Sequence, residues 1–192
     1  MTEASSVRVA VLGGGMSGIC MGVKLRQQGI EDFVILEKAA AVGGTWRENT
    51  YPGIACDVPS HVYSFSFELN PEWSHSYSSG KEIWDYCERT VDKYDLRRHI
   101  RFDTTVVDVT YDGQRWHVAT ADGHAFTADV VVSGLGGLHM PNSAAIAGRD
   151  TFAGACFIRP AGTTPSISAA SVSPSSARAP VPHRFCRKLP PR

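Results

Sequence analysis

The chain has 192 residues, 19 basic and 19 acidic side chains, and a hydrophobic share of 43%, which suits one domain with a buried core. The charge balance excludes a strong bias toward nucleic acid or anionic membranes, and no apolar run approaches the ~20 residues of a membrane span. Five widely spaced cysteines without a CxxC pair argue against a zinc site or a secreted disulfide framework. The start of the chain does not resemble a signal peptide, so a cytoplasmic location is expected.

The first 37 residues predict a β-α-β unit. Residues 7–12 form an apolar, β-branched run, residues 16–28 carry apolar side chains at helical spacing, and residues 33–37 form a second apolar run. Gly29 is a natural stop for the helix. This order of elements requires a parallel sheet with a right-handed crossover.

The turn between the first strand and the helix carries a GxGxxG motif, formed by Gly13, Gly15 and Gly18. Such glycines permit a tight turn, close approach of a pyrophosphate to the backbone, and close packing of helix on strand. The helix N-terminus then favours phosphate charge, and Ser17 belongs to the same predicted site. Glu37 follows Gly18 by nineteen residues and is placed to bind ribose hydroxyls. The motif predicts a dinucleotide site but does not separate NAD from FAD.

Residues 38–80 show no clear period, and such a long irregular stretch is usually functional or disordered. Residues 81–94 predict an amphipathic helix. Three strands with Asp-Gly turns between them follow, at residues 100–111, 116–120 and 125–133. The predicted fold class is therefore α/β, a Rossmann-like domain with a parallel sheet and a small antiparallel β meander.

Residues 43–57, GGTWRENTYPGIACD, resemble the signature of the Baeyer–Villiger monooxygenases. That signature is a Gly-Gly-x-Trp, then an aromatic-Pro-Gly, then an aspartate four residues after the last glycine. The resemblance implies an FAD-binding domain over residues 1–157. It also implies that FAD contacts come from Lys38, Gly44, Thr45, Trp46, Asp57, Tyr63 and Val106.

The resemblance gives Asp57 a catalytic role, since the matching aspartate lies beside the flavin and orients an arginine of an NADPH-binding domain. An isolated aspartate would more simply cap the turn before Val58 and Pro59. The implied reaction uses NADPH to reduce FAD. Oxygen then reacts with the reduced flavin, and the product attacks a ketone carbonyl to give an ester or lactone.

Other flavoprotein classes fit the same stretch less well. Disulfide reductases carry a redox-active cysteine pair shortly after their Gly-Gly, whereas Cys56 has no nearby partner. The N- and S-oxygenating flavin monooxygenases share the glycine motifs without this aspartate arrangement, and they are the second candidate. Two weaker resemblances, residues 104–106 and 131–134, suggest strands beside the nucleotide. The histidines show no metal-ligand spacing, so no metal site is expected.

Residues 158–192 differ in composition from the rest of the chain. They hold seven of the eleven prolines, six basic residues and no acidic one, so they are expected to be a disordered tail. Phe152-x-Gly154 begins a second family signature, which fails where position 158 is isoleucine instead of histidine.

One missing base near Phe157 would explain that failure. If the codons of residues 158–164 are shifted by one base, they are compatible with the sequence HSARWDH. The shifted codons from Ala170 to Pro182 are compatible with GKRVAVIGTGASA, which contains a second dinucleotide motif. The tail is therefore expected to be out of frame, without the NADPH-binding domain of the intact relatives, which would leave an inactive or purely flavin-binding fragment. The alternative is a natural basic tail that binds nucleic acid.

Overall fold

The structure is a computed structural model that describes residues 4–137 and residue 147. Residues 4–137 divide into two compact units, residues 4–48 with 81–137, and residues 49–80. The expectations for residues 158–192 lie outside the described residues.

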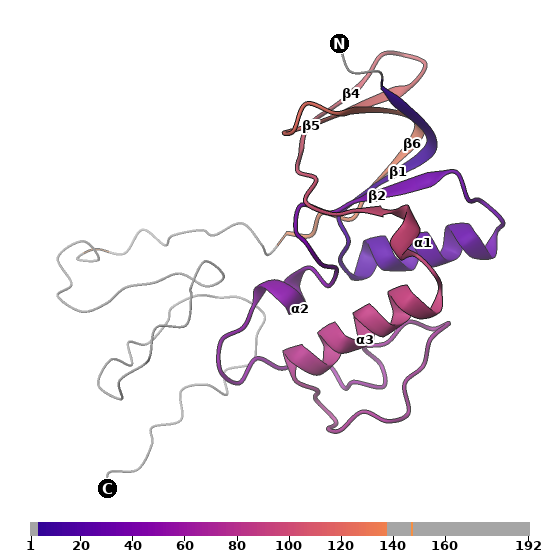
Figure 1. Ribbon diagram of the computed structural model, residues 1–192. Helices are drawn as coiled ribbons and strands as arrows, with labels where there is room; N and C mark the ends of the chain where they lie inside the picture. The colour runs from indigo at the N-terminus through magenta and orange to yellow at the C-terminus, as the bar shows by residue number, and fades with distance from the viewer. Residues whose placement is uncertain (1–3, 138–146, 148–192) are drawn as a thin grey trace, which may run out of the picture. The chain divides into compact units, whose positions relative to one another are not determined.

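The first unit begins with the predicted β-α-β arrangement. Strand β1 (Ser5–Leu12) leads into helix α1 (Met16–Gln27), and β2 (Phe33–Leu36) returns parallel to β1 with Val9 opposite Phe33. Helix α1 ends before Gly29, whose φ of +71° suits glycine. The β-α-β prediction is confirmed (Figure 1).

In the part of the chain that the structure describes, the sheet has six strands in the order β3-β2-β1-β6-β5-β4. Strand β6 (Ala125–Ser133) runs parallel to β1 and antiparallel to β5 (Trp116–Thr120), which is in turn antiparallel to β4 (Val106–Tyr111). The predicted antiparallel meander therefore extends the parallel sheet instead of forming one of its own (Figure 1). The predicted fold class is confirmed.

The single strand predicted over residues 100–111 is wrong. Strand β3 (Ile100–Arg101) pairs with β2, whereas β4 lies at the opposite edge of the sheet. Between them Asp103 adopts a φ of +52° and donates its N–H to the Ala39 carbonyl, and the Thr104 N–H bonds to the Glu37 carbonyl. Since these backbone groups bond to the segment after β2, the strand cannot continue through them.

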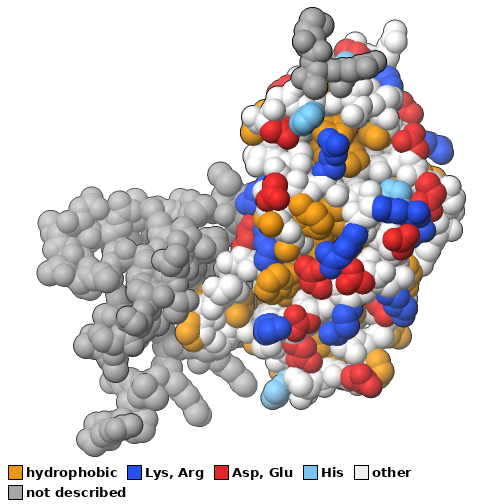
Figure 2. All heavy atoms as spheres, viewed as in Figure 1, with side chains coloured by type: hydrophobic (Ala, Val, Ile, Leu, Met, Phe, Trp, Pro, Cys, Tyr) orange, Lys and Arg blue, Asp and Glu red, His pale blue; other side chains and the backbone are white. Residues whose placement is uncertain are grey.

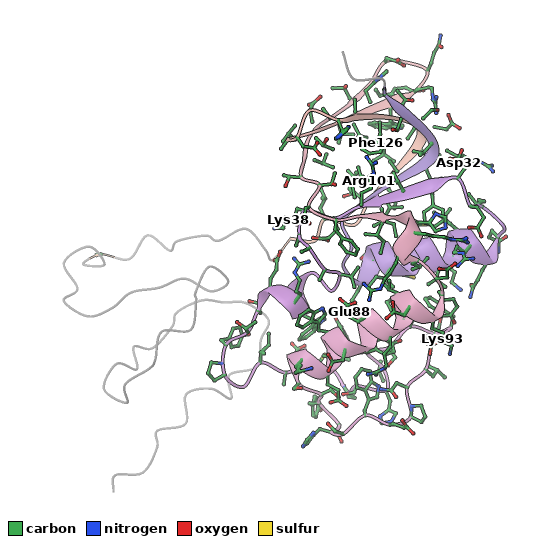
Figure 3. All side chains as sticks on the ribbon, viewed as in Figure 1. Asp32, Lys38, Glu88, Lys93, Arg101 and Phe126 are labelled. Carbon is green, nitrogen blue, oxygen red and sulfur yellow. The ribbon has the colours of Figure 1, made fainter. Side chains whose placement is uncertain are left out.

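One face of the sheet forms an apolar core. Alternate residues of the strands meet there, because successive strand side chains point to opposite faces. Figure 3 shows Arg101 beside Phe126, with the guanidinium 5.5 Å from the ring centroid, so this cation covers one edge of the core. The buried members are Ala10, Leu12, Val34, Leu36, Val118, Phe126 and Ala128.

Helix α3 (Gly80–Lys93) runs beside α1 (Figure 1) and is followed by a 3-10 turn at Arg97–His99. Its buried side carries Ile83, Cys87 and Val91, and the Cys87 Sγ lies 3.3 Å from the Met16 Sδ. The predicted helix over residues 81–94 is confirmed. The short helix α2 (Thr45–Glu48) was not predicted.

The exposed side of α3 carries charges of both signs. Lys81 pairs with Asp85, and Arg97 pairs with Glu88 and Asp92. Figure 2 shows acidic and basic side chains interspersed on this face, and Figure 3 labels Glu88 on α3. Exposed pairs of this kind each contribute about 0–1 kcal/mol, so packing of its buried side is what holds α3. Within residues 4–137, no helix is long and apolar enough to cross a membrane.

Burial makes Cys87 a reporter of unfolding. Desolvation, with a smaller contribution from Glu88, raises the pKa of its thiol from 9.0 to about 12. Because the thiolate is the reactive form, we expect alkylation of Cys87 near neutral pH to be about 100- to 1000-fold slower in the folded chain than in urea. Peptide mass spectrometry after timed labelling separates Cys87 from the half-buried Cys20.

The same shift has a consequence for stability. The folded chain holds the Cys87 proton more tightly than the unfolded chain. The contribution of the protonated thiol to the free energy of unfolding is therefore complete below pH 9 and is lost as the pH rises toward about 12. Equal alkylation rates for Cys87 in the folded and unfolded chain would contradict the packing of α3 on α1.

Candidate nucleotide-binding site

Two of the motif glycines are required by the fold itself. Gly13 has a φ of +98°, and a Cβ there would lie 2.8 Å from the Gly134 carbonyl oxygen. A Cβ on Gly18 would lie only 1.9 Å from the Gly13 carbonyl oxygen. The Gly134 N–H also donates to the Leu12 carbonyl at 2.8 Å. The loop, the start of α1 and the end of β6 therefore meet backbone to backbone.

Gly15 is different. Its φ of −78° and ψ of −169° are extended values open to any residue, and the nearest atom to a Cβ there would be the Gly44 Cα at an ordinary 3.8 Å. The packing of the described residues gives no reason for a glycine at this position. A glycine there leaves the backbone open to close approach by a ligand.

The N-terminus of α1, directly after Gly15, has the properties of an anion site. Gly15 is the N-cap, no side chain caps the helix, and its first turn carries no acidic residue. The first N–H groups of a helix lack partners inside the helix, and the helix dipole places partial positive charge there. Ser17 lies exposed in the same turn. A phosphate group is the ligand that this arrangement suits.

Glu37 is buried at 3% exposure and reaches the glycine loop. Its Oε2 accepts the Gly14 N–H at 2.7 Å, and its Oε1 accepts the Ala39 N–H at 3.0 Å. The carboxylate therefore fastens the loop that follows β1 to the end of β2. This location agrees with a position beside a bound nucleotide, while ribose binding itself stays a prediction.

The Gly-Gly of the signature packs against the glycine loop. The Gly43 N–H donates to the Gly14 carbonyl at 3.0 Å, and a Cβ on Gly44 would lie 3.2 Å from the Gly15 Cα. Gly43 has a φ of +112°, and the Trp84 indole would lie 2.6 Å from a Cβ there. The signature thus positions α2 directly after this contact, with Thr45 exposed and Trp46 half-buried.

Arg47 was not among the predicted site residues. Its Nη1 lies 3.2 Å from the Glu37 Oε1, and its Nη2 lies 2.9 Å from the Glu48 Oε1. Glu48 also pairs with the predicted residue Lys38, whose Nζ is 3.2 Å from the same oxygen. The adjacent Arg-Glu pair, directly after the Gly-Gly-x-Trp motif, was the available signal for this cluster.

The segment before β4 lies next to Glu37. The Asp103 and Thr104 N–H groups bond to the Ala39 and Glu37 carbonyls, and Val106 follows as the first residue of β4, packed against the core. One unit therefore brings together most of the predicted cofactor residues. These are Gly13, Gly15, Ser17, Gly18, Glu37, Lys38, Gly44, Thr45 and Trp46, with the segment leading to Val106.

Asp57 and Tyr63 belong to the other unit. Two hydrogen bonds hold their segment together. The Cys56 N–H donates to the Ser78 carbonyl at 3.0 Å, and the Ser60 Oγ donates to the Ser78 Oγ at 2.8 Å. Asp57 is exposed and Tyr63 half-buried. Their roles toward a flavin stay predictions.

The remaining candidate chemistries concern metals and cysteines. Within the described part of the chain, no group of three or more His, Cys, Asp or Glu side chains could hold a metal ion. The described cysteines Cys20, Cys56 and Cys87 are free. Among the described residues, the glycine loop with Glu37 is therefore the candidate functional site.

Residues 10–158 match the family described as pyridine nucleotide-disulphide oxidoreductase. The chain is 52% identical over 153 residues to a Baeyer–Villiger monooxygenase of Streptomyces coelicolor, covering 79% of this chain and 29% of the relative. Cyclohexanone monooxygenase from Rhodococcus sp. Phi1, solved with NADP+, has a TM-score of 0.71 at 38% identity over 78% of this chain and 29% of its own. OTEMO, solved with FAD and NADP, has a TM-score of 0.69 at 29% identity with the same coverage.

The fold and the glycine loop are thus those of a Rossmann-like α/β domain of the oxidoreductase class. The chain belongs to the pyridine nucleotide-disulphide oxidoreductase family. It is a homologue of the Baeyer–Villiger monooxygenases and corresponds to their N-terminal FAD-domain region. It spans about 30% of the length of these relatives. The family prediction is confirmed.

Proposed function

We propose that the chain binds FAD at the glycine loop. Gly15 carries this proposal, because it is the motif glycine that the packing of the described residues does not require. In the proposed complex the pyrophosphate lies at the N-terminus of α1, and Glu37 accepts a ribose hydroxyl. Thr45 and Trp46 approach the flavin from α2. The presence of FAD and NADP in the OTEMO structure supports this assignment.

The chain spans about 30% of the length of its relatives, and we further propose that the full-length form of such a protein inserts oxygen next to a ketone carbonyl, with NADPH and O2 as co-substrates. Bound FAD supplies the redox chemistry, and the protein positions it and excludes water. Asp57 is the catalytic residue proposed within this chain. The name of cyclohexanone monooxygenase supports a ketone as substrate class. The 192 residues alone are proposed to bind FAD without turning over NADPH.

The proposal is tested by titrating the purified chain with FAD and following flavin fluorescence. The proposed pyrophosphate contact at α1 and the ribose contact of Glu37 both engage the adenosine diphosphate half of FAD, so we expect FAD to bind at least about 100-fold more tightly than FMN, a difference of about 2.7 kcal/mol. Equal affinities, or no flavin binding at all, would overturn the assignment. NADPH consumption stimulated by a ketone would overturn the proposal that these residues do not turn over.

We also propose that residues from about position 158 onward are translated out of frame. The match to the oxidoreductase family, which covers residues 10–158, supports a change of sequence character at this point. Resequencing the gene tests the idea, because a restored frame should encode the GKRVAVIGTGASA-like run. A restored frame without any dinucleotide motif would refute it.

A further inference from the structure

The acceptor sites of Glu37 can be counted. An ionised carboxylate offers about four lone-pair sites, two on each oxygen. Oε1 accepts from the Ala39 N–H and from the Arg47 Nη1, and Oε2 accepts from the Gly14 N–H. With these contacts from the described residues, one acceptor site remains, and it is on Oε2, the oxygen that contacts the glycine loop.

The ion pair that occupies Oε1 is buried. The side chains of Arg47 and Glu37 are 12% and 5% exposed, and their N–O distance is 3.2 Å. Removing one partner of a buried pair costs far more than removing one partner of an exposed pair, because the other charge stays uncompensated. Arg47 therefore acts on Glu37 more strongly than a surface arginine would.

Arg47 is itself held in place by two further acceptors. It donates to the Ala41 carbonyl, and its Nη2 lies 2.9 Å from Glu48. The guanidinium is a rigid planar fork, so contacts at both ends fix its orientation. The short helix α2 thus presents a fixed cation to the oxygen of Glu37 that does not face the glycine loop.

We propose that Arg47 is a positioning residue that holds the Glu37 carboxylate with Oε2 toward Gly14, leaving one acceptor site for a ribose hydroxyl of the nucleotide. The ribose part of this inference rests on the proposed FAD binding, whereas the effect on Glu37 and Gly14 does not. Without Arg47, Oε1 keeps only the Ala39 N–H, and the side chain is freer to rotate away from the loop.

The first test needs no ligand. The Gly14 N–H is protected by Oε2, so Arg47→Met should speed its hydrogen exchange by about tenfold or more and shift its amide resonance. Arg26→Met is the matched control, because Arg26 also pairs with two acidic residues, Glu31 and Asp95, at the other end of α1. A Gly14 amide that behaves alike in wild type and Arg47→Met would overturn the proposal.

The second test measures the ribose contact by comparing FAD with its 2′-deoxyadenosine analogue. A hydrogen bond to a charged acceptor predicts at least about tenfold weaker binding of the analogue to wild type. Arg47→Met should reduce this preference to less than about threefold, with Arg47→Lys between the two and Arg26→Met unchanged. If Arg47 had only a structural role, Arg47→Met would weaken the binding of both ligands equally. A preference for FAD over the analogue that stays as large in Arg47→Met as in wild type would contradict the inference. Failure of wild type to bind either ligand would overturn the proposed function, while the Gly14 amide would still decide the role of Arg47.

Discussion

Replacing Gly18 by alanine is expected to destabilise the folded chain by about 3–5 kcal/mol, a large share of the roughly 5–15 kcal/mol that stabilises a typical domain. The added Cβ would lie 1.9 Å from the Gly13 carbonyl oxygen and 3.0 Å from its carbon. Both atoms belong to the backbone and cannot move aside by changing rotamer. The N-terminus of α1 would have to separate from the loop that follows β1.

Urea denaturation followed by circular dichroism measures this effect. Gly22→Ala is the matched control on the same helix, because its Cβ would meet the flexible ends of Ile35 and Leu96 at 2.9 and 3.3 Å, and alanine also favours the helix by about 1 kcal/mol. We expect it to change the free energy of unfolding by less than about 1 kcal/mol. A Gly18→Ala chain as stable as Gly22→Ala would show that helix and loop do not approach this closely.

Replacing Gly15 by alanine is expected to give the opposite result. The extended backbone at this position accommodates alanine, and the nearest contact of its Cβ would be an ordinary 3.8 Å. The free energy of unfolding without ligand should change by less than about 1 kcal/mol, since alanine restricts the unfolded chain but is a poorer N-cap than glycine. A methyl group at the proposed pyrophosphate site should nevertheless weaken FAD binding at least about 100-fold.

The two measurements on Gly15→Ala, urea denaturation without FAD and flavin titration, separate a role in binding from a role in folding. Loss of both stability and affinity would place Gly15 with Gly18 as a packing residue. Retention of full FAD affinity in Gly15→Ala would contradict the proposal that the pyrophosphate binds at the N-terminus of α1. A stable chain that no longer binds FAD is the outcome that supports the proposed site.

The sequence by itself determined the β-α-β unit, the helix after residue 80 and the family. Alternation, helical spacing and the Gly13 to Gly18 motif are local patterns, and local patterns are readable without the fold. The signature over residues 43–57 had the same advantage, since all its defining positions lie within fifteen consecutive residues.

Only the tertiary structure decided which glycine serves which purpose. Gly15 and Gly18 look alike in the motif, and what separates them is the atom that a Cβ would meet. At Gly18 it would clash with the Gly13 backbone, whereas at Gly15 it would make an ordinary contact with the Gly44 Cα. The break at residues 102–105 was hidden for a similar reason, because their partners are the carbonyls of Glu37 and Ala39. Arg47 became a candidate only when Glu37, ten residues earlier in the chain, was seen to share its oxygens between Arg47 and Gly14. The adjacent Arg47 and Glu48 mark a charged cluster in the sequence, but the partner of Arg47 depends on how separate segments pack, and that requires the tertiary structure.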